Sequence, residues 1–248
     1  MNNTKVYQAG LKFLFERAVD KCIGGEVIFH HSLDKGIYAS IISKEKVTED
    51  IIMKIKESMN QMIEESIPFH KKVVEKREAY EFFRKKGQTE KAYNVLNISN
   101  LTVSLFEFDG KYNYFYTHEM PMSSKELSLY DLYHVNENEV VLLYPTNDEI
   151  TFVFRKKIYE SFANYDKWLN ALNLNYVHDV NEIIASGNVA DLIRKNDIMM
   201  DNKLYDMAKE IVKRGKKIVL LAGPSSSGKT TSSKKLSLYL ESFGYHAM

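Results

Sequence analysis

The sequence predicts an α+β fold for residues 1–155, a helical connector over 156–215, and the first strand–loop–helix unit of an α/β fold over 216–248. Three observations support this division. Strand-like and helix-like periodicities are mixed without strict alternation as far as residue 155, which favours α+β over a parallel α/β sheet. Apolar residues then keep helical spacing to Arg214, and a short β-branched run precedes the last helical pattern.

The composition is that of an ordinary globular protein and excludes several classes. The formal net charge is +1, so no whole-chain field attracts nucleic acid or an anionic membrane. The one cysteine, Cys22, excludes an intrachain disulfide and a multi-cysteine zinc site. The longest clean apolar run, over residues 218–222, is far shorter than the ~20 residues that span a bilayer. Because the N-terminus also lacks the apolar run of a signal peptide, we expect a cytoplasmic protein without membrane association.

The first elements follow from apolar spacing and from cap residues. Thr48 is expected to cap a helix whose first turn holds Glu49 and Asp50, and Pro68 prevents that helix from continuing. The other elements expected in the first ninety residues are a helix over 11–21 that Gly24 and Gly25 end, strands over 27–29 and 36–42, and a helix over 75–86.

The next stretch changes to a period of two. Strands over 102–108 and 111–117 flank Asp109-Gly110, the strongest short-range signal for a two-residue hairpin turn. A second pair is expected between strands over 139–144 and 150–154.

From Lys156 the chain is expected to be helical until Gly215 ends the last helix of the connector. The expected elements are helical patterns beginning at Lys156, over 180–185 and over 192–214, then a strand over 218–222 and a helix over 229–243.

The loop between the last two elements carries the motif with the clearest chemistry. It has the pattern G-x-x-x-x-G-K-[ST], and its residues are Gly223, Pro224, Ser225, Ser226, Ser227, Gly228, Lys229 and Thr230. A strand entering the loop and a helix leaving it are the structural context in which this pattern binds phosphate. The alternative is a Gly/Ser-rich turn with no ligand.

The residue types suit a polyphosphate. Gly223 and Gly228 permit the tight curl that brings the amides of Ser225, Ser226 and Ser227 toward phosphate oxygens, and the helix that follows adds its unpaired amides. Lys229 is expected to contact the β- and γ-phosphates of ATP, and the Thr230 hydroxyl to ligate Mg²⁺. Thr231 is a weaker candidate for phosphate contact.

Residues 218–240 resemble the opening of the uridine kinase/phosphoribulokinase family. The loop is similar to that of a bacterial subgroup in which the kinase follows a region like the editing-type domain of threonyl-tRNA synthetase. Residues 29–38, ending in Gly36-Ile37-Tyr38, resemble a segment of that domain, and residues 76–87 resemble its Arg-Glu-Ala helix. The resemblance implies an ATP-dependent nucleoside kinase with ATP and Mg²⁺ as cofactors and a nucleoside as second substrate.

The chain departs from this resemblance in two ways. The synthetase domain carries a His-x-x-x-His helix and a Cys-x-x-x-His pair, whereas this chain has Phe13 and Arg17 on the matching helix and no cysteine near His118. This argues against aminoacyl-tRNA editing. The family's Asp-Asp-Tyr-Phe-type segment, which holds the acceptor base, is expected beyond Met248, so we expect this polypeptide alone to lack kinase turnover.

Other candidate residues have a functional and a structural interpretation. His30 and His31 are expected on opposite faces of a strand, and with His70 and His118 they form a metal site or are simply hydrogen-bonded. The tyrosines at 112, 114 and 116 stack bases or pack in a core.

Two further features have the same two interpretations. Cys22 is a reactive thiol or, as we favour, a structural one. The basic run over residues 213–217 contacts phosphate or is a solvated helix end.

Two other function classes remain open. Residues 1–155 form a module that binds a small ligand or a tRNA end and regulates the kinase, or the loop belongs to an unrelated ATPase or GTPase. An unpaired strand over 218–222 would leave a sheet edge open, which makes a homo-oligomer an alternative to a monomer.

Overall fold

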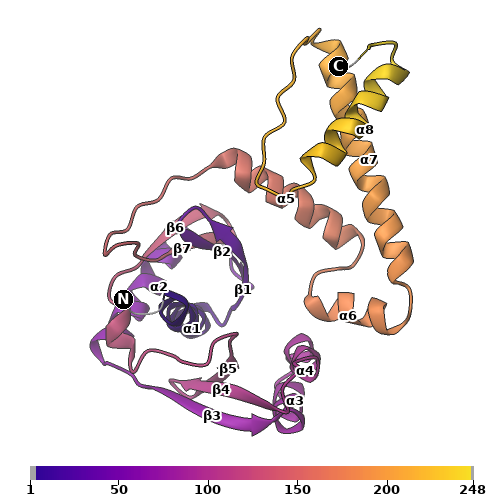
Figure 1. The fold of residues 1–248 in the computed structure, drawn as a ribbon. Helices are drawn as coiled ribbons and strands as arrows, with labels where there is room; N and C mark the ends of the chain where they lie inside the picture. The colour runs from indigo at the N-terminus through magenta and orange to yellow at the C-terminus, as the bar shows by residue number, and fades with distance from the viewer. Residues whose placement is uncertain (1–3, 247–248) are drawn as a thin grey trace. The chain divides into compact units, whose positions relative to one another are not determined.

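The computed structural model describes residues 4–246 and divides into two compact units, one up to His178 and one from Asp179 on. The first unit is mixed α and β, and the second contains helices (Figure 1). The domain boundaries expected at 155 and 215 remain predictions.

Two antiparallel sheets form the first unit. The four-stranded sheet has the order β1–β2–β7–β6, and the three-stranded sheet has the order β3–β4–β5. The strands are β1 (Glu26–Leu33), β2 (Gly36–Ile42), β3 (Phe69–Glu75), β4 (Thr102–Phe108), β5 (Lys111–Tyr114), β6 (Asp131–Asn136) and β7 (Glu139–Leu143). The helices are α1 (Thr4–Ile23), α2 (Glu49–Glu64), α3 (Lys76–Lys85), α4 (Thr89–Leu96) and α5 (Lys156–Ala171), with a short 3₁₀ turn η1 (Ser124–Leu127).

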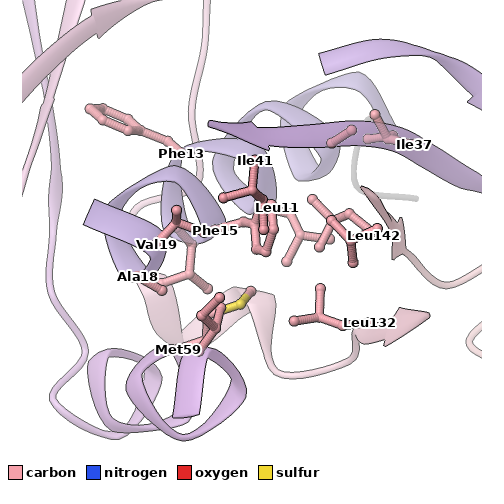
Figure 2. Close-up of a cluster of buried hydrophobic side chains, with 14 of the residues drawn as sticks. Leu11, Phe13, Phe15, Ala18, Val19, Ile37, Ile41, Met59, Leu132 and Leu142 are labelled. Atoms are coloured by element: carbon pink, nitrogen blue, oxygen red, sulfur yellow. The ribbon is translucent and has the colours of Figure 1, made fainter. Parts of the chain in front are cut away.

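Helix α1 is the centre of the main core. Phe13 and Phe15 are two residues apart, about 200° around a helix, so their side chains leave opposite sides. The Phe13 ring packs against Phe108 of β4 at 5.6 Å between centroids, and the Phe15 ring lies 6.3 Å from Phe29 of β1. Figure 2 shows Phe13 directed away from the side chains around Phe15. One helix therefore supplies apolar contacts to both sheets, which confirms the helix expected over 11–21 and extends it.

Helix α2 forms as its sequence predicts. The Thr48 hydroxyl accepts a hydrogen bond from the Ile51 amide at 3.4 Å, and Glu49 and Asp50 occupy the first turn. Its buried face packs on α1 and places Met59 in the main core (Figure 2). The members of that face are Ile52, Ile55, Met59 and Met62.

The Asp109-Gly110 hairpin is also confirmed. Both residues have positive φ, 47° and 75°, as a turn of this type requires. The strand after the turn ends at Tyr114, three residues earlier than expected. Helices α3 and α4 pack beside this sheet around a second, smaller core that includes Phe83 and Val95.

The strand pairing expected between 139–144 and 150–154 is wrong. β7 pairs with β2 on one edge and with β6 on the other, so neither edge is free for residues 150–154. The alternating side chains of Ile150, Phe152 and Phe154 instead pack against a cluster that includes Val141. β3, α4 and β6 were not among the elements predicted from the sequence.

The second unit contains α7 (Val189–Lys213) and α8 (Lys229–Ser242), and α6 (Val177–Ala185) crosses the division between the units. The helical patterns expected after Lys156 are confirmed, and Gly215 follows α7 at φ 58°. The strand expected over 218–222 is not formed, and Figure 1 shows an irregular stretch between α7 and α8. A strand needs a hydrogen-bonded neighbour, and all seven strands among residues 4–246 belong to the first unit.

Within residues 4–246, no helix combines the length and the apolar character needed to cross a membrane.

Candidate functional site

The candidate site is the loop that leads into α8. Its last residue, Gly228, is the N-cap of α8 and has φ 76°, and Ser226 has φ 60°. A side chain at position 228 would meet no neighbouring atom within 4 Å, so the backbone conformation, rather than space, favours glycine there. The loop is therefore curled, as the motif predicts.

The first glycine of the motif has a different role. A Cβ atom on Gly223 would lie 2.8 Å from the Ser227 hydroxyl oxygen. The two ends of the loop approach each other closely, and a larger residue at 223 would force Ser227 to move. The Ser227 amide donates to the Pro224 carbonyl at 3.4 Å, which helps close the turn.

The start of α8 presents a row of backbone donors. The first intrahelical hydrogen bond runs from the Ser232 amide to the Gly228 carbonyl at 2.9 Å. The amides of Lys229, Thr230 and Thr231 precede it and have no acceptor within the helix. Together with the helix dipole, they make this end of α8 attractive to an anion.

Lys229 is held over the loop. Its Nζ donates to the Pro224 carbonyl at 2.5 Å, so the ammonium group lies against the backbone of the loop. The loop residues around it are exposed, among them Ser225, Ser226 and Thr230. A ligand can therefore reach both the ammonium group and the amides.

The donor set fits the phosphates of a nucleotide and gives one protein ligand for Mg²⁺. Backbone amides and Lys229 suit phosphate oxygens, and the exposed Thr230 hydroxyl suits a hard cation. Among residues 4–246 there is no group of three or more His, Cys, Asp or Glu placed to hold a metal. Mg²⁺ at Thr230 would therefore take its remaining ligands from phosphate and water, as is usual for this ion.

α8 is fixed by its contact with α7. The two helices bury Leu236 of α8 and Leu204 and Ala208 of α7, and the Tyr205 ring packs edge-on against Tyr239 at 5.7 Å. Lys235 pairs with Asp201 across the two helices at 2.7 Å. That hydrogen bond raises the pKa of Lys235.

The contacts of Leu204 and Ala208 and the ion pair between Asp201 and Lys235 were not predicted from the sequence. Leu204 and Ala208 are four residues apart and lie on one face of α7, so their spacing could have predicted a buried face there. The pairing of Asp201 with Lys235 depends on how the two helices cross, which the spacing did not specify.

The histidines of β1 are not on opposite faces, because the strand is irregular. The β1–β2 register shifts between Phe29 and Ser32, and both rings lie against Tyr38, at 5.0 Å for His30 and 5.2 Å for His31. His30 Nε2 is hydrogen-bonded to the Ser40 hydroxyl at 2.8 Å, and His31 stacks on Phe162 at 3.6 Å. These contacts are those of packed, hydrogen-bonded side chains.

The tyrosine stripe of β5 is divided. Tyr112 and Tyr114 pack against the α3 phenylalanines Phe82 and Phe83, whereas the Tyr116 side chain is 82% exposed. Burial raises the pKa of Tyr114 well above its ordinary value.

The contacts of Cys22 and of the basic run over residues 213–217 fit the structural interpretation of each. The Cys22 thiol donates to the Lys54 carbonyl at 3.6 Å, which suits a structural role. Arg214 pairs with Glu210 at 2.6 Å, and Lys216 and Lys217 are exposed.

The two α1 positions that match the synthetase histidines are structural. Phe13 lies in the core, and Arg17 bonds Asp109 at 2.8 Å and also Asp20. Burial opposes ionisation of Asp109, but its hydrogen bonds with Lys21 and Arg17 outweigh this and lower its pKa. Neither position offers a metal ligand or a free base.

No known family model matches the chain, and a search of curated proteins found no match either. The resemblance to a kinase therefore rests on the residues of the motif and their geometry.

Proposed function

We propose that this chain binds ATP at residues 223–230 and supplies the donor half of a nucleoside kinase of the uridine kinase type. One observation carries the proposal: a G-x-x-x-x-G-K-T sequence that is curled at Gly228 leads directly into the free amides of α8. Within the proposed kinase, this loop would belong to a P-loop domain and residues 1–155 to a synthetase-like domain.

Each residue has a defined part in this proposal. The amides of Lys229, Thr230 and Thr231, with those of the three loop serines, hold phosphate oxygens. The Lys229 ammonium exchanges the Pro224 carbonyl for a phosphate oxygen and neutralises its charge. Mg²⁺, when bound at the Thr230 hydroxyl, supplies further charge neutralisation. Phosphoryl transfer depends mainly on positioning and charge, so this donor half is a large share of the required machinery.

Binding of Mg-ATP to the full chain, measured by titration calorimetry, tests the donor half. Lys229→Ala is expected to weaken binding by roughly 10- to 100-fold, because a charge-assisted hydrogen bond contributes about 1.5–3 kcal/mol. Lys234→Ala is the matched control, since Lys234 is an exposed lysine of the same helix. Equal affinity in the Lys229 variant and the unaltered chain would contradict the proposal.

Transfer is tested separately with γ-labelled ATP and uridine. The segment that carries the resemblance, residues 218–240, supplies the ATP-binding half alone, so we expect ATP binding without transfer from these residues. Label on uridine at an ordinary enzymatic rate would contradict that expectation and confirm a kinase. Label released only as inorganic phosphate would favour the ATPase alternative.

A further inference from the structure

The first unit contains a cavity of about 480 Å³ that the loop motif does not involve. Its walls come from α1, β1, α4 and the end of β5. This volume lies within the range of pockets that hold small organic ligands, about 300–1,000 Å³.

One wall is a polar stripe on an otherwise buried helix. Gln8, Lys12 and Glu16 of α1 are four residues apart, so they share one face, and all three line the cavity. The neighbouring residues Phe13 and Arg17 lie on other faces and have the structural contacts described above. Buried polar groups require partners. Gln8 is hydrogen-bonded to Tyr144 and Glu16 has partners on other elements, so Lys12 is the member of the stripe that a ligand can satisfy.

Lys12 has no anionic partner among residues 4–246. Its Nζ lies 5.4 Å from the centroid of the Phe29 ring. The side chain is partly buried, and this burial lowers the pKa of Lys12. Glu16 does not compensate for it, because Glu16 is already bonded to Lys91 at 3.3 Å and to Asn113 at 2.7 Å. An acidic group on a ligand would satisfy the Lys12 ammonium.

The α4 wall presents hydrogen-bond acceptors, whereas Lys12 presents a cation. The Asn94 side-chain oxygen is buried and has no hydrogen-bond partner within residues 4–246. Glu90, one turn earlier on the same helix, also lines the cavity and can only accept when ionised. The third carboxylate of the lining, Glu26, is exposed. A buried acceptor without a partner costs free energy. The α4 wall therefore favours a ligand with N–H or O–H donors.

A flat aromatic surface completes the site. The Tyr116 ring lines the cavity, is 82% exposed, and meets Tyr114 edge-on at 5.9 Å. An exposed ring held by a neighbouring ring offers a face on which a planar group can stack.

We propose that this cavity binds a nucleoside monophosphate. Its phosphate pairs with Lys12, its base stacks on Tyr116, and the N–H groups of the base donate to Asn94 and Glu90. An acid, a planar ring and N–H donors occur together in this class of molecule. The site is independent of the ATP-binding loop, so the two proposals can fail separately.

Equilibrium dialysis of the full chain against labelled AMP, GMP, CMP and UMP tests this. We expect at least one of them to bind with Kd below about 1 mM, and Lys12→Met to weaken that binding about tenfold or more. Methionine retains the apolar stem of lysine. Lys125→Met, at an exposed lysine away from the cavity, and Lys229→Ala, in the loop, are expected to leave the affinity unchanged.

Tyr116→Ala provides a second test that does not depend on the fold, because this side chain is exposed; it is expected to weaken binding severalfold. The proposal would be overturned if none of the four nucleotides bound, or if both Lys12→Met and Tyr116→Ala left the affinity unchanged. It would also be overturned if Lys229→Ala abolished binding, or if nucleosides and inorganic phosphate each bound as tightly as the monophosphate.

Discussion

Many apolar residues of the first unit are buried in a main core around α1 and in two smaller clusters, whereas most of those in the second unit are exposed. α1 alone buries eight residues between two sheets and α2. In the second unit the described buried apolar residues are Leu204, Ala208 and Leu236. Exposed there are, among others, Ile193, Ile198, Met207, Ile218 and Leu220. Both units follow apolar periodicity, so the difference lies in whether a second layer covers the apolar face.

Residues 218–222 and β2 show the same difference for strand-like sequences. The sequence of β2 and the run IVLLA are both apolar and rich in β-branched residues. β2 lies between β1 and β7 and is hydrogen-bonded on both edges, whereas Ile218 and Leu220 are 82% and 89% exposed and lie outside any sheet. Strand propensity is realised only where another strand pairs with it.

The largest effect is expected in the core of the first unit. Phe13→Ala should lower the free energy of unfolding by about 3–5 kcal/mol, because it removes a buried ring and leaves a cavity between α1 and the β3–β4–β5 sheet. Urea unfolding followed by circular dichroism measures this. Met122→Ala, at a side chain that is 85% exposed, is the control. A loss below 1 kcal/mol for Phe13→Ala would show that the core does not depend on α1 as described.

A smaller effect is expected in the second unit. Leu236→Ala should destabilise the α7–α8 pair by about 2 kcal/mol, at the low end for a buried leucine because few buried neighbours surround it. Amide hydrogen exchange in α8 should accelerate while exchange in α1 stays unchanged. Leu238→Ala, 65% exposed on the same helix, should have little effect. Equal acceleration in both units would contradict the separation of their cores.

The smallest effect is electrostatic and lies at the hairpin of the first unit. Asp109→Asn keeps a residue that tolerates the positive φ of the turn but removes the charge that pairs with Arg17 and Lys21, so we expect a loss of about 1 kcal/mol at neutral pH.

The pH dependence has a definite sign. The folded pKa of Asp109 is lower than the ordinary aspartate value of 3.8. Its stabilisation is therefore complete above about pH 5 and is lost as the pH falls through the folded pKa. The difference in stability between the unaltered chain and Asp109→Asn should shrink in acid. A difference that grows below pH 4 would contradict the role given to this ion pair.

Local signals in the sequence were sufficient for several elements. Thr48 with Glu49 and Asp50 predicted the start of α2, and Asp109-Gly110 predicted the hairpin, because caps and tight turns depend on residues within a few positions of each other. The loop residues Gly223 and Gly228 could be assigned for the same reason. Lys12 and Glu16 follow helical spacing but were not predicted as a site, because their meaning depends on Asn94 and Tyr116, which are far away along the chain.

Pairing between distant segments could not be predicted from such local signals. The periodicity of residues 150–154 suited a strand, but β6 and β2 already occupy both edges of β7. His30 and His31 were expected to point apart, but a bulge in the β1–β2 register brings both to Tyr38. Each outcome was decided by which strand lies next to which.

The sequence by itself determined the start of α2, the Asp109-Gly110 turn and the G-x-x-x-x-G-K-T pattern of residues 223–230. These features depend on backbone preferences and capping groups that act within a few residues. The tertiary structure decided which strands pair, which helix is central, that residues 218–222 remain outside a sheet, and that Lys12 and Asn94 line one cavity. Those outcomes depend on competition among distant segments for hydrogen-bond partners and for burial. The spacing of residues within a short segment does not predict how that competition ends.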